Sequence, residues 1–388
     1  MNIVSILLAS LISINILKFV FNTSTLLNVI LIVAYNFTAI NKLFFLKKIK
    51  KNNFIILLGV LSLYSISIST LFIDFSTYRL FLFLEFSTVL ITGFRTAILD
   101  LKTIKKAFNY IVYINTAFSL YLILFNDIIF EYLKSSTVAN DLTLSLPLGI
   151  SCIILFIYIL FDGYNQKKYI FFLIVNILAS FSFASRGSNL FIIFVFLICV
   201  IYYLLKAKKN LRYFLNVVFG TIILGITSYF IFNKVTSNKY LTYEIIRLFT
   251  NIENEPRISL YLNYISNLKD FWLTGVGFGN SYILMDMDKT LTAYPHNLFL
   301  EIWGEFGIMG FIIFLIINFK LVLNLILYRF WANKYYVISF LCFLYSGFIY
   351  SISFSIKGGY LYFIFFGILV TYMDNFKKED KGTLSKYE

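Results

Sequence analysis

The sequence predicts an all-α, polytopic transmembrane helix bundle of about 12 helices with one large extracytoplasmic loop. Of its 388 residues, 60% are hydrophobic and only 13% are charged, whereas soluble domains carry about 25% charged residues. The mean hydropathy is +0.84. Aromatic residues make up 20% of the chain, with 46 Phe and 29 Tyr, as is typical of helices packed in lipid with Tyr at the headgroup level. These observations exclude a soluble globular protein.

Apolar runs close to the length that crosses a membrane recur along the chain, since a helix of about 20 apolar residues spans the hydrocarbon core. The first run lacks a basic leader and a small-residue cleavage site, so we expect a retained helix rather than a signal peptide. In chain order the runs lie near residues 3–20, 25–45, 54–73, 79–99, 107–126, 146–162, 168–184, 189–205, 212–232, 298–319, 334–353 and 358–373.

The runs and the polar segments between them divide the chain into four parts. Residues 1–232 carry the first nine predicted helices, and residues 298–373 carry the last three. The segment 233–297 between them is long and polar enough to form a small domain, and we expect it to be the large extracytoplasmic loop. The final residues, 374–388, are predicted to be a cytoplasmic tail. A second polar segment, 127–145, is expected on the same side as the large loop.

Basic residues gather after the even-numbered runs. The positive-inside rule therefore places both termini in the cytoplasm, in a multi-pass protein of the cytoplasmic (inner) membrane. The net charge of +14 is mainly this topology signal, with attraction to anionic membrane lipid as a second effect, and we expect no nucleic-acid partner. A reaction on the outer side must use a substrate that is already activated, because no ATP is present there. The short loops after odd-numbered runs carry only the scattered Arg79, Lys134, Arg186 and Lys357.

The only histidine of the chain, His296, directly precedes the tenth apolar run. Imidazole is the side chain that ordinarily changes charge near neutral pH, which makes it the first candidate for a catalyst. Pro295 favours a helix start here. The positive end of the helix dipole then disfavours the protonated imidazole, and the neutral form can act as a general base. The alternative is a polar residue that caps the helix, and the sequence leaves both interpretations open.

Two arginines are predicted on the same side of the membrane as His296. Arg186 lies between two apolar runs, and an arginine at membrane depth faces a cavity or a partner by default, unless it snorkels at a helix end. Arg257 is equally well explained as a solvated loop charge. Guanidinium groups bind phosphate oxygens bidentately. Two arginines and one neutral base therefore indicate a hydroxyl nucleophile and an anionic leaving group such as a diphosphate.

An amphipathic helix lying on the membrane is predicted after Arg257, because apolar residues recur there at helical spacing and Pro256 suits its first turn. The glycines of 275–279 indicate a flexible turn and not a dinucleotide site, because no strand–helix unit frames them. The predicted apolar face of the helix consists of Ile258, Tyr261, Leu262, Ile265 and Leu268.

Two acidic residues, Glu301 and Glu305, lie four residues apart on the tenth predicted helix and hence on one face of it. They either pair with an arginine, hold the tautomer of the histidine, or form a polar helix entrance. Glycines three residues apart in the same helix predict close packing against a neighbour. These glycines are Gly304, Gly307 and Gly310.

Neither a metal ion nor a cofactor is expected. Cys152, Cys199 and Cys342 lie within apolar runs without metal-ligand spacing, so we expect them to be small buried hydrophobic residues. No carboxylate cluster with metal-ligand spacing is evident either.

At this point the chain resembles the O-antigen polymerase and O-antigen ligase superfamily. The residues from His296 to Gly310 are similar to the family pattern of His-Asn, a Leu-Glu pair and an acidic residue before Gly-Ile-x-Gly. Arg257, its helix and the glycine turn at 275–279 resemble the second block of the family, and Ser185-Arg186-Gly187 resembles its arginine turn. The likeness covers roughly residues 180–315.

Two residues depart from the family pattern, Pro256 before the arginine and Tyr261 in place of a tryptophan, and neither removes a charge or the base. The resemblance implies an all-helical membrane fold with one large external loop and glycosyl transfer from an oligosaccharide linked to a polyprenyl diphosphate. By carry-over it implies three groups of residues: Arg186 and Arg257 as ligands of the diphosphate, His296 as the general base, and Asn297, Glu301 and Glu305 as supporting residues.

Three functions are compatible with the sequence. The first is a polymerase of polysaccharide repeat units, of O-antigen or capsule, with a chain-length regulator protein as a possible partner. The second is a ligase that transfers the glycan to a lipid A core or a protein, which uses the same donor chemistry. The third is a flippase or transporter, a class that usually places polar residues on broken helices near the bilayer midplane. Glu85, deep in the fourth run, favours this third function.

Overall fold

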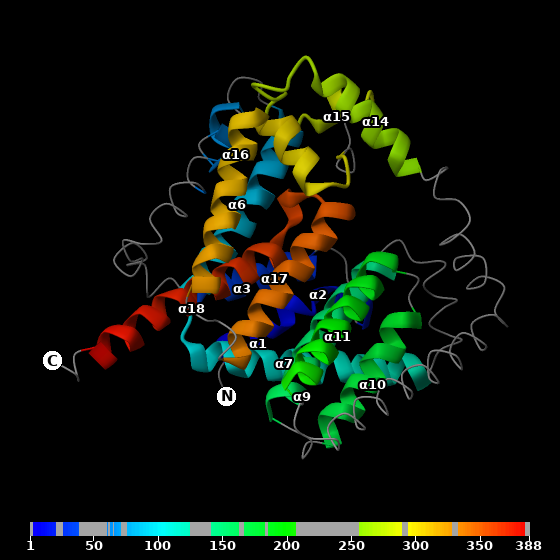
Figure 1. Cartoon of the computed structure of the whole chain (residues 1–388). Coiled ribbons are helices and arrows are strands. Elements are labelled where there is room, and N and C mark those ends of the chain that lie inside the picture. The colour runs from blue at the N-terminus through cyan, green and yellow to red at the C-terminus, as the bar shows by residue number, and fades with distance from the viewer. Residues whose placement is uncertain are drawn as a thin grey trace. The chain divides into compact units, whose positions relative to one another are not determined.

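The structure is a computed structural model, and it describes the chain over residues 3–20, 26–38, 60, 63–64, 66–70, 76–124, 141–162, 167–182, 185–206, 256–288, 294–327 and 333–384. Within these ranges the backbone forms helices and turns without any strand, which confirms the all-α class (Figure 1). The helix predicted at 212–232 and the part of the large loop before residue 256 lie outside the described residues.

The chain divides into two compact units, of which unit 1 comprises residues 1–31 and 105–252, and unit 2 comprises residues 32–104 and 253–388. Unit 1 contains α1 (Ile3–Ile12), α2 (Ile14–Val20), most of α7 (Leu101–Leu124), α9 (Asp141–Asp162), α10 (Lys167–Ser182) and α11 (Arg186–Lys206). Unit 2 contains the second half of α3 (Leu26–Phe37), together with α6 (Thr77–Ala97), α14 (Pro256–Leu268), α15 (Ser281–Leu284), α16 (Leu298–Leu327), α17 (Lys334–Ile352), η4 (Ile356–Gly358) and α18 (Tyr360–Leu384).

Uncharged polar groups connect the helices of unit 1. Pro147 lies inside α9 and has no N–H, so it leaves the carbonyl of Thr143 without its helical partner. The side-chain amide of Asn15 on α2 donates to this carbonyl at 3.2 Å. From α7, the amide of Asn115 donates to the carbonyl of Pro147 at 2.8 Å and to the hydroxyl of Ser151 at 2.6 Å. The irregular turn of α9 is thus satisfied by neighbouring helices, as the membrane interior requires.

Small residues bring α6 and α18 of unit 2 into close contact. A Cβ atom at Gly367 would lie 2.2 Å from the carbonyl oxygen of Gly93, and a Cβ atom at Gly93 would lie 2.9 Å from that of Phe363. Only glycine permits this approach, which is the usual way for membrane helices to pack backbone against backbone. The Thr371 hydroxyl adds a hydrogen bond to the Thr96 carbonyl at 3.1 Å.

The helix α16 turns back on itself. Gly307 has φ 66° and ψ −174°, which is not a helical conformation. The ring centre of Phe299 lies 6.5 Å from that of Phe311 and 6.2 Å from that of Phe314, whereas twelve residues of straight helix would separate them by about 18 Å. A first segment, 298–306, therefore packs beside a second segment, 308–327 (Figure 1). The sequence predicted one uninterrupted helix at 298–319, with Gly307 among the glycines that pack against a neighbouring helix. This prediction is wrong at Gly307, where the helix breaks.

The glycine segment 275–279 fills the break in α16. Amide groups of this segment bind the carbonyl groups that the break leaves free, and the segment lies so close that a Cβ atom at Gly275 would be 2.5 Å from the Gly307 nitrogen. This segment is a tightly packed partner of the bend and not the flexible turn that the sequence predicted. The hydrogen bonds run from Val276 N to Gly304 O (2.8 Å), from Gly277 N to Glu305 O (3.1 Å) and from Ile308 N to Trp272 O (2.9 Å).

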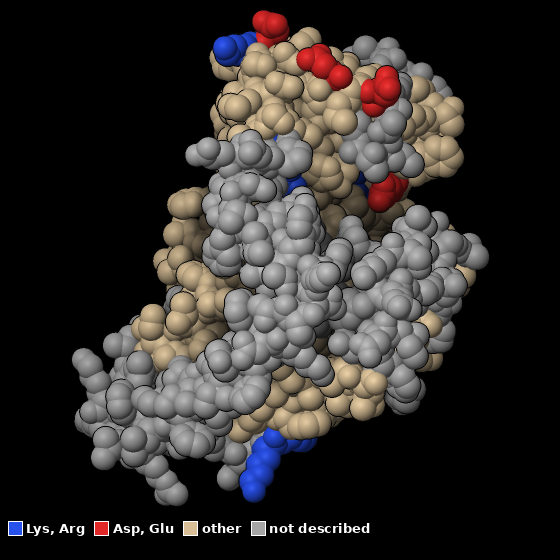
Figure 2. Space-filling model, turned by 90° about the vertical axis from the view of Figure 1, so that its right-hand side faces the viewer, with Lys and Arg blue, Asp and Glu red and all other residues tan. Residues whose placement is uncertain are grey.

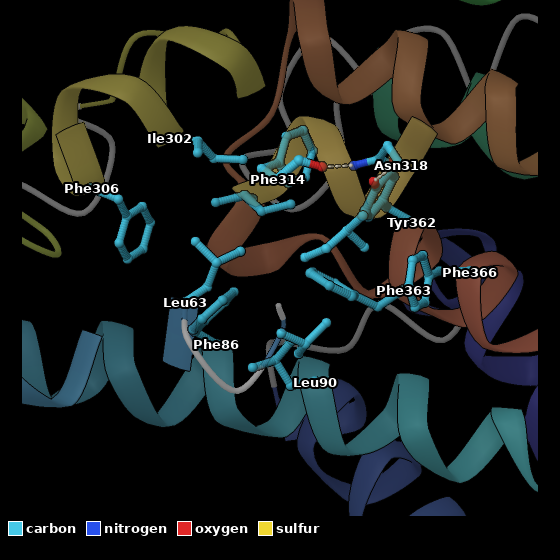
Figure 3. A pocket seen from close by; sticks show the side chains of 13 residues that line it. Leu63, Phe86, Leu90, Ile302, Phe306, Phe314, Asn318, Tyr362, Phe363 and Phe366 are labelled. Atoms are coloured by element: carbon cyan, nitrogen blue, oxygen red, sulfur yellow. Dashed lines mark hydrogen bonds between the residues drawn. The ribbon is translucent and has the colours of Figure 1, made fainter. Parts of the chain in front are cut away.

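Aromatic and aliphatic side chains pack beneath the bend. Both segments of α16 meet α6 and α18 around an apolar cavity of about 30 Å³ (Figure 3), which is room for about one water molecule. Asn318 is its one polar side chain besides Tyr362, and the Tyr362 hydroxyl donates to the Asn318 carbonyl oxygen. This enclosed space is part of the core and too small for a substrate.

The described helices fit a protein that spans a membrane. Five of them are long and apolar enough to cross one, and three shorter helices are also apolar. Many large hydrophobic side chains are exposed, and the face drawn in Figure 2 shows few charged side chains among the described residues. The predicted count of about 12 helices and the cytoplasmic position of both termini stay predictions.

Several predicted boundaries differ from the observed ones. The helix α7 begins at Leu101, so the lysines at 102, 105 and 106 lie inside it and not in a connecting loop. The helix α9 begins at Asp141, inside the predicted polar segment 127–145. The helix α18 continues to Leu384, through most of the predicted tail. In each case the helix continues into polar residues. The prediction missed this part because hydropathy marks only the apolar part of a helix.

Candidate functional site

The turn that carries His296 directly precedes α16. Asn297 caps the helix, because its side-chain oxygen accepts hydrogen bonds from the amides of Phe299 at 3.0 Å and Leu300 at 3.1 Å. His296 itself has φ 50°, a left-handed conformation that costs a non-glycine residue of order 1–3 kcal/mol and that often marks a functional position. The capping bonds belong to Asn297, so capping is not the role of the imidazole.

A backbone carbonyl determines which nitrogen of His296 carries the proton. The Nδ1 atom lies 3.0 Å from the carbonyl oxygen of Ser353, at the end of α17. A carbonyl oxygen only accepts, so the neutral ring must carry its proton on Nδ1. The Nε2 atom then presents a lone pair. The half-buried imidazole is therefore in the tautomer that a general base acting through Nε2 requires.

Arg257 is held at the same end of α17. Its Nη1 atom donates to the carbonyl oxygen of Ile352 at 2.8 Å, and its side chain is exposed. Ile352 and Ser353 are consecutive, so adjacent carbonyl groups bind the arginine and the histidine. The helix α14 makes a second link, because the hydroxyl of Tyr261 donates to the His296 carbonyl at 3.3 Å. The structure thus brings together Arg257 and His296, which are 39 residues apart in the sequence.

The ring of Tyr294 packs against His296 with a distance of 4.3 Å between the ring centres. Burial raises the pKa of Tyr294 to about 12. The phenol therefore stays protonated at neutral pH and does not act as a base. Of these two neighbouring rings, only the imidazole can accept a proton there.

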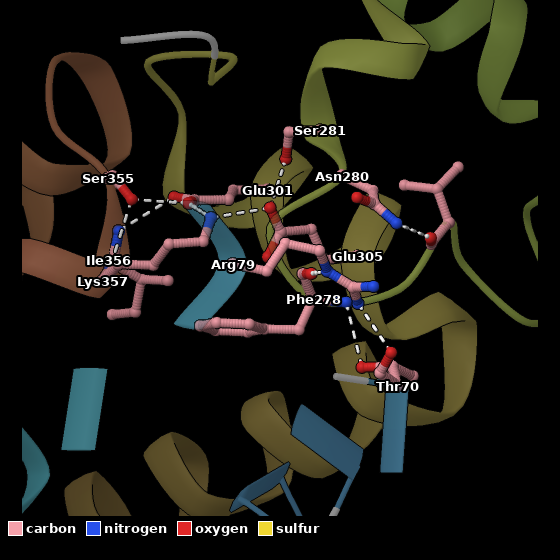
Figure 4. A network of polar contacts seen from close by, with 11 residues as sticks. Thr70, Arg79, Phe278, Asn280, Ser281, Glu301, Glu305, Ser355, Ile356 and Lys357 are labelled. Carbon is pink, nitrogen blue, oxygen red and sulfur yellow. Dashed lines mark hydrogen bonds and ion pairs between the residues drawn. The ribbon is translucent and has the colours of Figure 1, made fainter. Parts of the chain in front are cut away.

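A buried ion network lies one turn further along α16 (Figure 4). The ammonium group of Lys357 contacts Glu301 Oε1 at 2.5 Å and Glu305 Oε1 at 2.6 Å, and all three side chains are almost wholly inaccessible. The hydroxyl of Ser281 donates to Glu305 at 2.6 Å, and the Phe278 ring lies 5.5 Å from the ammonium. The two glutamates share a face, as predicted, but their charged partner is a lysine and not an arginine.

Lys357 is a fixed positive charge. Burial by itself lowers the pKa of the ammonium, but the charges of Glu301 and Glu305 and their hydrogen bonds raise it by more, so that the pKa lies above its usual range. The network holds two carboxylates and one ammonium. Glu305 Oε2 is buried and has no hydrogen-bond partner among the described residues.

Two charged residues of this region escaped the sequence prediction, which placed Arg79 and Lys357 among scattered loop charges. Arg79 is 1% exposed, and it donates to the carbonyl oxygens of Phe278 at 2.7 Å and Thr70 at 2.8 Å. It thereby fixes the glycine segment beside the bend (Figure 4). The available signal was a charge that directly adjoins an apolar run, which in membrane proteins is usually buried against a partner.

Arg186 belongs to unit 1 and begins α11. The preceding Ser185 is buried, and its carbonyl accepts the amide of Asn189 at 3.1 Å, which closes the first turn of the helix. Arg186 and Gly187 therefore lie in the first turn of this helix, and not in a separate turn before it. Its role as a second ligand of a diphosphate stays a prediction.

The helix α14 is amphipathic, but its faces differ from the prediction. Tyr264 and Leu268 are buried, and they pack with Leu284 and Met285 beside α15. The side chains of Ile258, Leu262 and Ile265 are 39%, 63% and 48% exposed. Leu268 and Tyr261 thus belong to the packed face, and the other three residues form a separate exposed apolar face. Such a face is what an interfacial helix inserts into lipid.

A comparison with known protein families gives a match over this region of the chain. A family model described as O-antigen ligase matches residues 169–315, a range that contains Arg186, Arg257, His296, Glu301 and Glu305. Among curated proteins, none matches the chain. The family match confirms the resemblance to the O-antigen polymerase and O-antigen ligase superfamily that the sequence indicates.

Proposed function

We propose, on the premise that residues 169–315 place the chain in the O-antigen ligase and polymerase superfamily, that the protein is a polymerase of polysaccharide repeat units. It transfers a glycan from a polyprenyl diphosphate carrier to a sugar hydroxyl, on the outer face of the cytoplasmic membrane. The observation that carries the proposal is the contact of His296 Nδ1 with a carbonyl group, which leaves Nε2 free to accept a proton.

In the proposed reaction, Nε2 of His296 takes the proton of the acceptor hydroxyl. The acceptor oxygen forms a bond to the anomeric carbon of the donor sugar while the bond from that carbon to the diphosphate oxygen breaks. The leaving diphosphate takes the bonding electrons, and positive charge near its oxygens stabilises it. The imidazolium then returns its proton to the diphosphate or to water.

Arg257 is suited to stabilise the leaving group. Its guanidinium has five N–H donors in a planar fork, and one of them is used by Ile352. The Ile352 carbonyl orients the remaining donors of this exposed side chain. It is next to the Ser353 carbonyl, which binds the catalytic base. Arg186 is proposed as a second ligand of the diphosphate, as the family resemblance implies.

The polyprenyl tail of the donor needs an apolar path beside this site. A groove of about 1060 Å³ lies between α17 and the second segment of α16. Its lining is mainly apolar, and it includes Leu298 and Phe299, which follow the histidine turn, and Ser351, which precedes the two carbonyl groups. A tail in this groove would leave its diphosphate next to Arg257.

The ligase is the alternative within the same chemistry, with a lipid A core or a protein as acceptor. A chain-length regulator protein is a proposed partner of the polymerase only. Separating these functions requires the acceptor, because the donor chemistry is shared.

One observation favours a transporter. The helix α16 is broken and carries buried carboxylates beside the break, as discontinuous helices of transporters do. A transporter moves the lipid-linked glycan without breaking the bond between sugar and diphosphate. Purified protein that releases free polyprenyl diphosphate from the donor, in detergent and without a membrane barrier, would exclude this alternative.

The proposal is tested by Arg257→Ala and Arg257→Lys in purified protein with a lipid-linked donor. Loss of a charge-assisted contact to the diphosphate costs about 1.5–3 kcal/mol, so Arg257→Ala should lower kcat/KM by about 10- to 100-fold. Arg257→Lys should recover part of it, because an ammonium cannot make the bidentate contact. Lys269→Met, which removes an exposed charge past the end of α14, is the control. Full activity of Arg257→Ala would assign this residue to the solvated loop charges.

A further inference from the structure

We infer that Glu301 and Lys357 are positioning residues, which orient His296 through the turn between α17 and α18. The inference rests on the proposed function of His296 as the general base. It assigns a role to Lys357, a residue that neither the sequence pattern nor the family match singles out. The observations that carry it are the contacts of residues 353–359, the α17–α18 turn, with the first segment of α16.

The α17–α18 turn binds one carboxylate through three consecutive residues. The Ser355 hydroxyl donates to Glu301 Oε1 at 2.6 Å, the Ile356 amide donates to Oε2 at 2.9 Å, and the Lys357 ammonium contacts Oε1 at 2.5 Å. The carboxylate is wholly buried. Both of its oxygens therefore accept hydrogen bonds from this one turn.

The carboxylate and the imidazole belong to the same short stretch of chain. The Glu301 amide donates to the carbonyl of Asn297, which follows His296 directly. The α17–α18 turn thus contacts the start of α16 at two places, through Ser353 at the histidine and through residues 355–357 at the glutamate. Two contacts determine an orientation where a single one would permit rotation.

The contact at the glutamate is what keeps the Ser353 carbonyl in place. This carbonyl selects the Nδ1–H tautomer only while it lies within hydrogen-bonding distance of the ring. Without Lys357, two buried carboxylates would face each other without a counter-charge, and the α17–α18 turn would have to move to admit water. The imidazole would then lose its acceptor and populate both tautomers.

Lys357 also connects this turn to the bend of α16. Its ammonium bridges to Glu305, which lies two residues before the break at Gly307 and also accepts the Ser281 hydroxyl. The lysine is therefore joined to both ends of the first α16 segment. The guanidinium of Arg257 is bound by the Ile352 carbonyl, whereas the α17–α18 turn binds the histidine through Ser353.

The tautomer can be read directly, because the chain has a single histidine. Protein labelled with ¹⁵N-histidine and purified through a tag without histidine gives nitrogen resonances from His296 alone. We expect a protonated Nδ1 and an unprotonated Nε2 at pH about 8 in the parent protein. Lys357→Met should give a mixture of tautomers, Lys357→Arg should keep the parental pattern, and Lys269→Met serves as the control.

Kinetics provides the second readout. Misplacing the base by about 1 Å should lower kcat by about 100-fold, while the KM for the lipid-linked donor stays within about threefold. If Lys357→Met does not fold, the charge-neutral double variant Glu301→Gln/Lys357→Met replaces it, since it removes the pair together. In a His296→Ala background, the added Lys357→Met should change the residual rate by less than about twofold, because residues that act as a unit are not additive.

The outcomes separate this inference from the proposed function. An inactive His296→Ala, together with a Lys357→Met protein that keeps the parental tautomer and kcat, would overturn the inference and leave the general base intact. A fully active His296→Ala would overturn the proposed function itself. A loss in Lys357→Met that multiplies with that of His296→Ala would assign the lysine to general stability and also overturn the inference.

Discussion

The two units of the molecule use different polar groups inside an apolar environment. In unit 1 the described contacts between helices come from amides and hydroxyls, such as those of Asn115, Ser151 and Asn176. In unit 2 buried charges connect the elements, with Lys357 between two glutamates and Arg79 on the glycine segment. Neutral groups suffice in unit 1, even beside the turn of α9 that Pro147 interrupts. Lys357 and Arg79 lie where α16 is broken and a turn must be held next to the candidate base.

The largest effect on stability is expected from Lys357→Met. Removing one partner of a buried ion pair costs about 3–5 kcal/mol, because the remaining charge stays buried without compensation. In unit 1, Asn176→Ala removes amide bonds to Thr116 and the Phe172 carbonyl, which should cost about 1–3 kcal/mol. Unfolding in mixed micelles measures both. Equal losses of stability in Lys357→Met and Asn176→Ala would contradict the difference between the two units.

The bend in α16 predicts a smaller but sharp difference between two glycines. Gly307→Ala places a Cβ atom 2.2 Å from the Leu273 carbonyl oxygen at φ 66°, and we expect a loss of about 2–4 kcal/mol from strain and overpacking. At Gly347, inside α17, the nearest atom lies at 3.6 Å. Gly347→Ala should therefore be close to neutral. A Gly307→Ala protein with the parental unfolding midpoint would rule out the observed bend.

The smallest effect concerns pH. The carboxylates hold the pKa of Lys357 above its usual value of 10.5. The stability that this ammonium contributes is therefore complete below that value and is lost only as the pH rises through the raised pKa. Between about pH 7 and pH 9, the difference in unfolding midpoint between the parent and Glu301→Gln/Lys357→Met should be constant. A difference that changes across this range would mean that Lys357 or Glu301 titrates there, which would contradict a fixed ion pair.

The sequence predicts the parts of this site that repeat a local rule. A helix start was predicted at Pro295, and α16 begins at Leu298. The pair Glu301 and Glu305 shares one face, as spacing alone requires. The bend at Gly307 was misread, because a glycine inside an apolar run is equally compatible with close helix packing. What distinguishes a bend from close helix packing is that the carbonyl groups left free by the break accept hydrogen bonds from residues 275–279.

Long-range partners could not be obtained in this way. Nothing local to Lys357 indicates that it pairs with residues more than 50 positions away. The Ser353 carbonyl is also invisible to sequence analysis, since every residue has one. The candidate base was predicted from its chemistry, whereas the group that selects its tautomer became visible only in the fold.

The central claim is that Nε2 of His296 accepts a proton from the acceptor hydroxyl. The direct measurement is the turnover of purified His296→Ala with a saturating lipid-linked donor and acceptor, alongside binding of the donor. We expect a loss of about 100- to 10,000-fold in kcat, with donor binding retained because the substitution leaves the proposed diphosphate ligand Arg257 unchanged. A His296→Ala protein that extends glycan at the parental rate would contradict it.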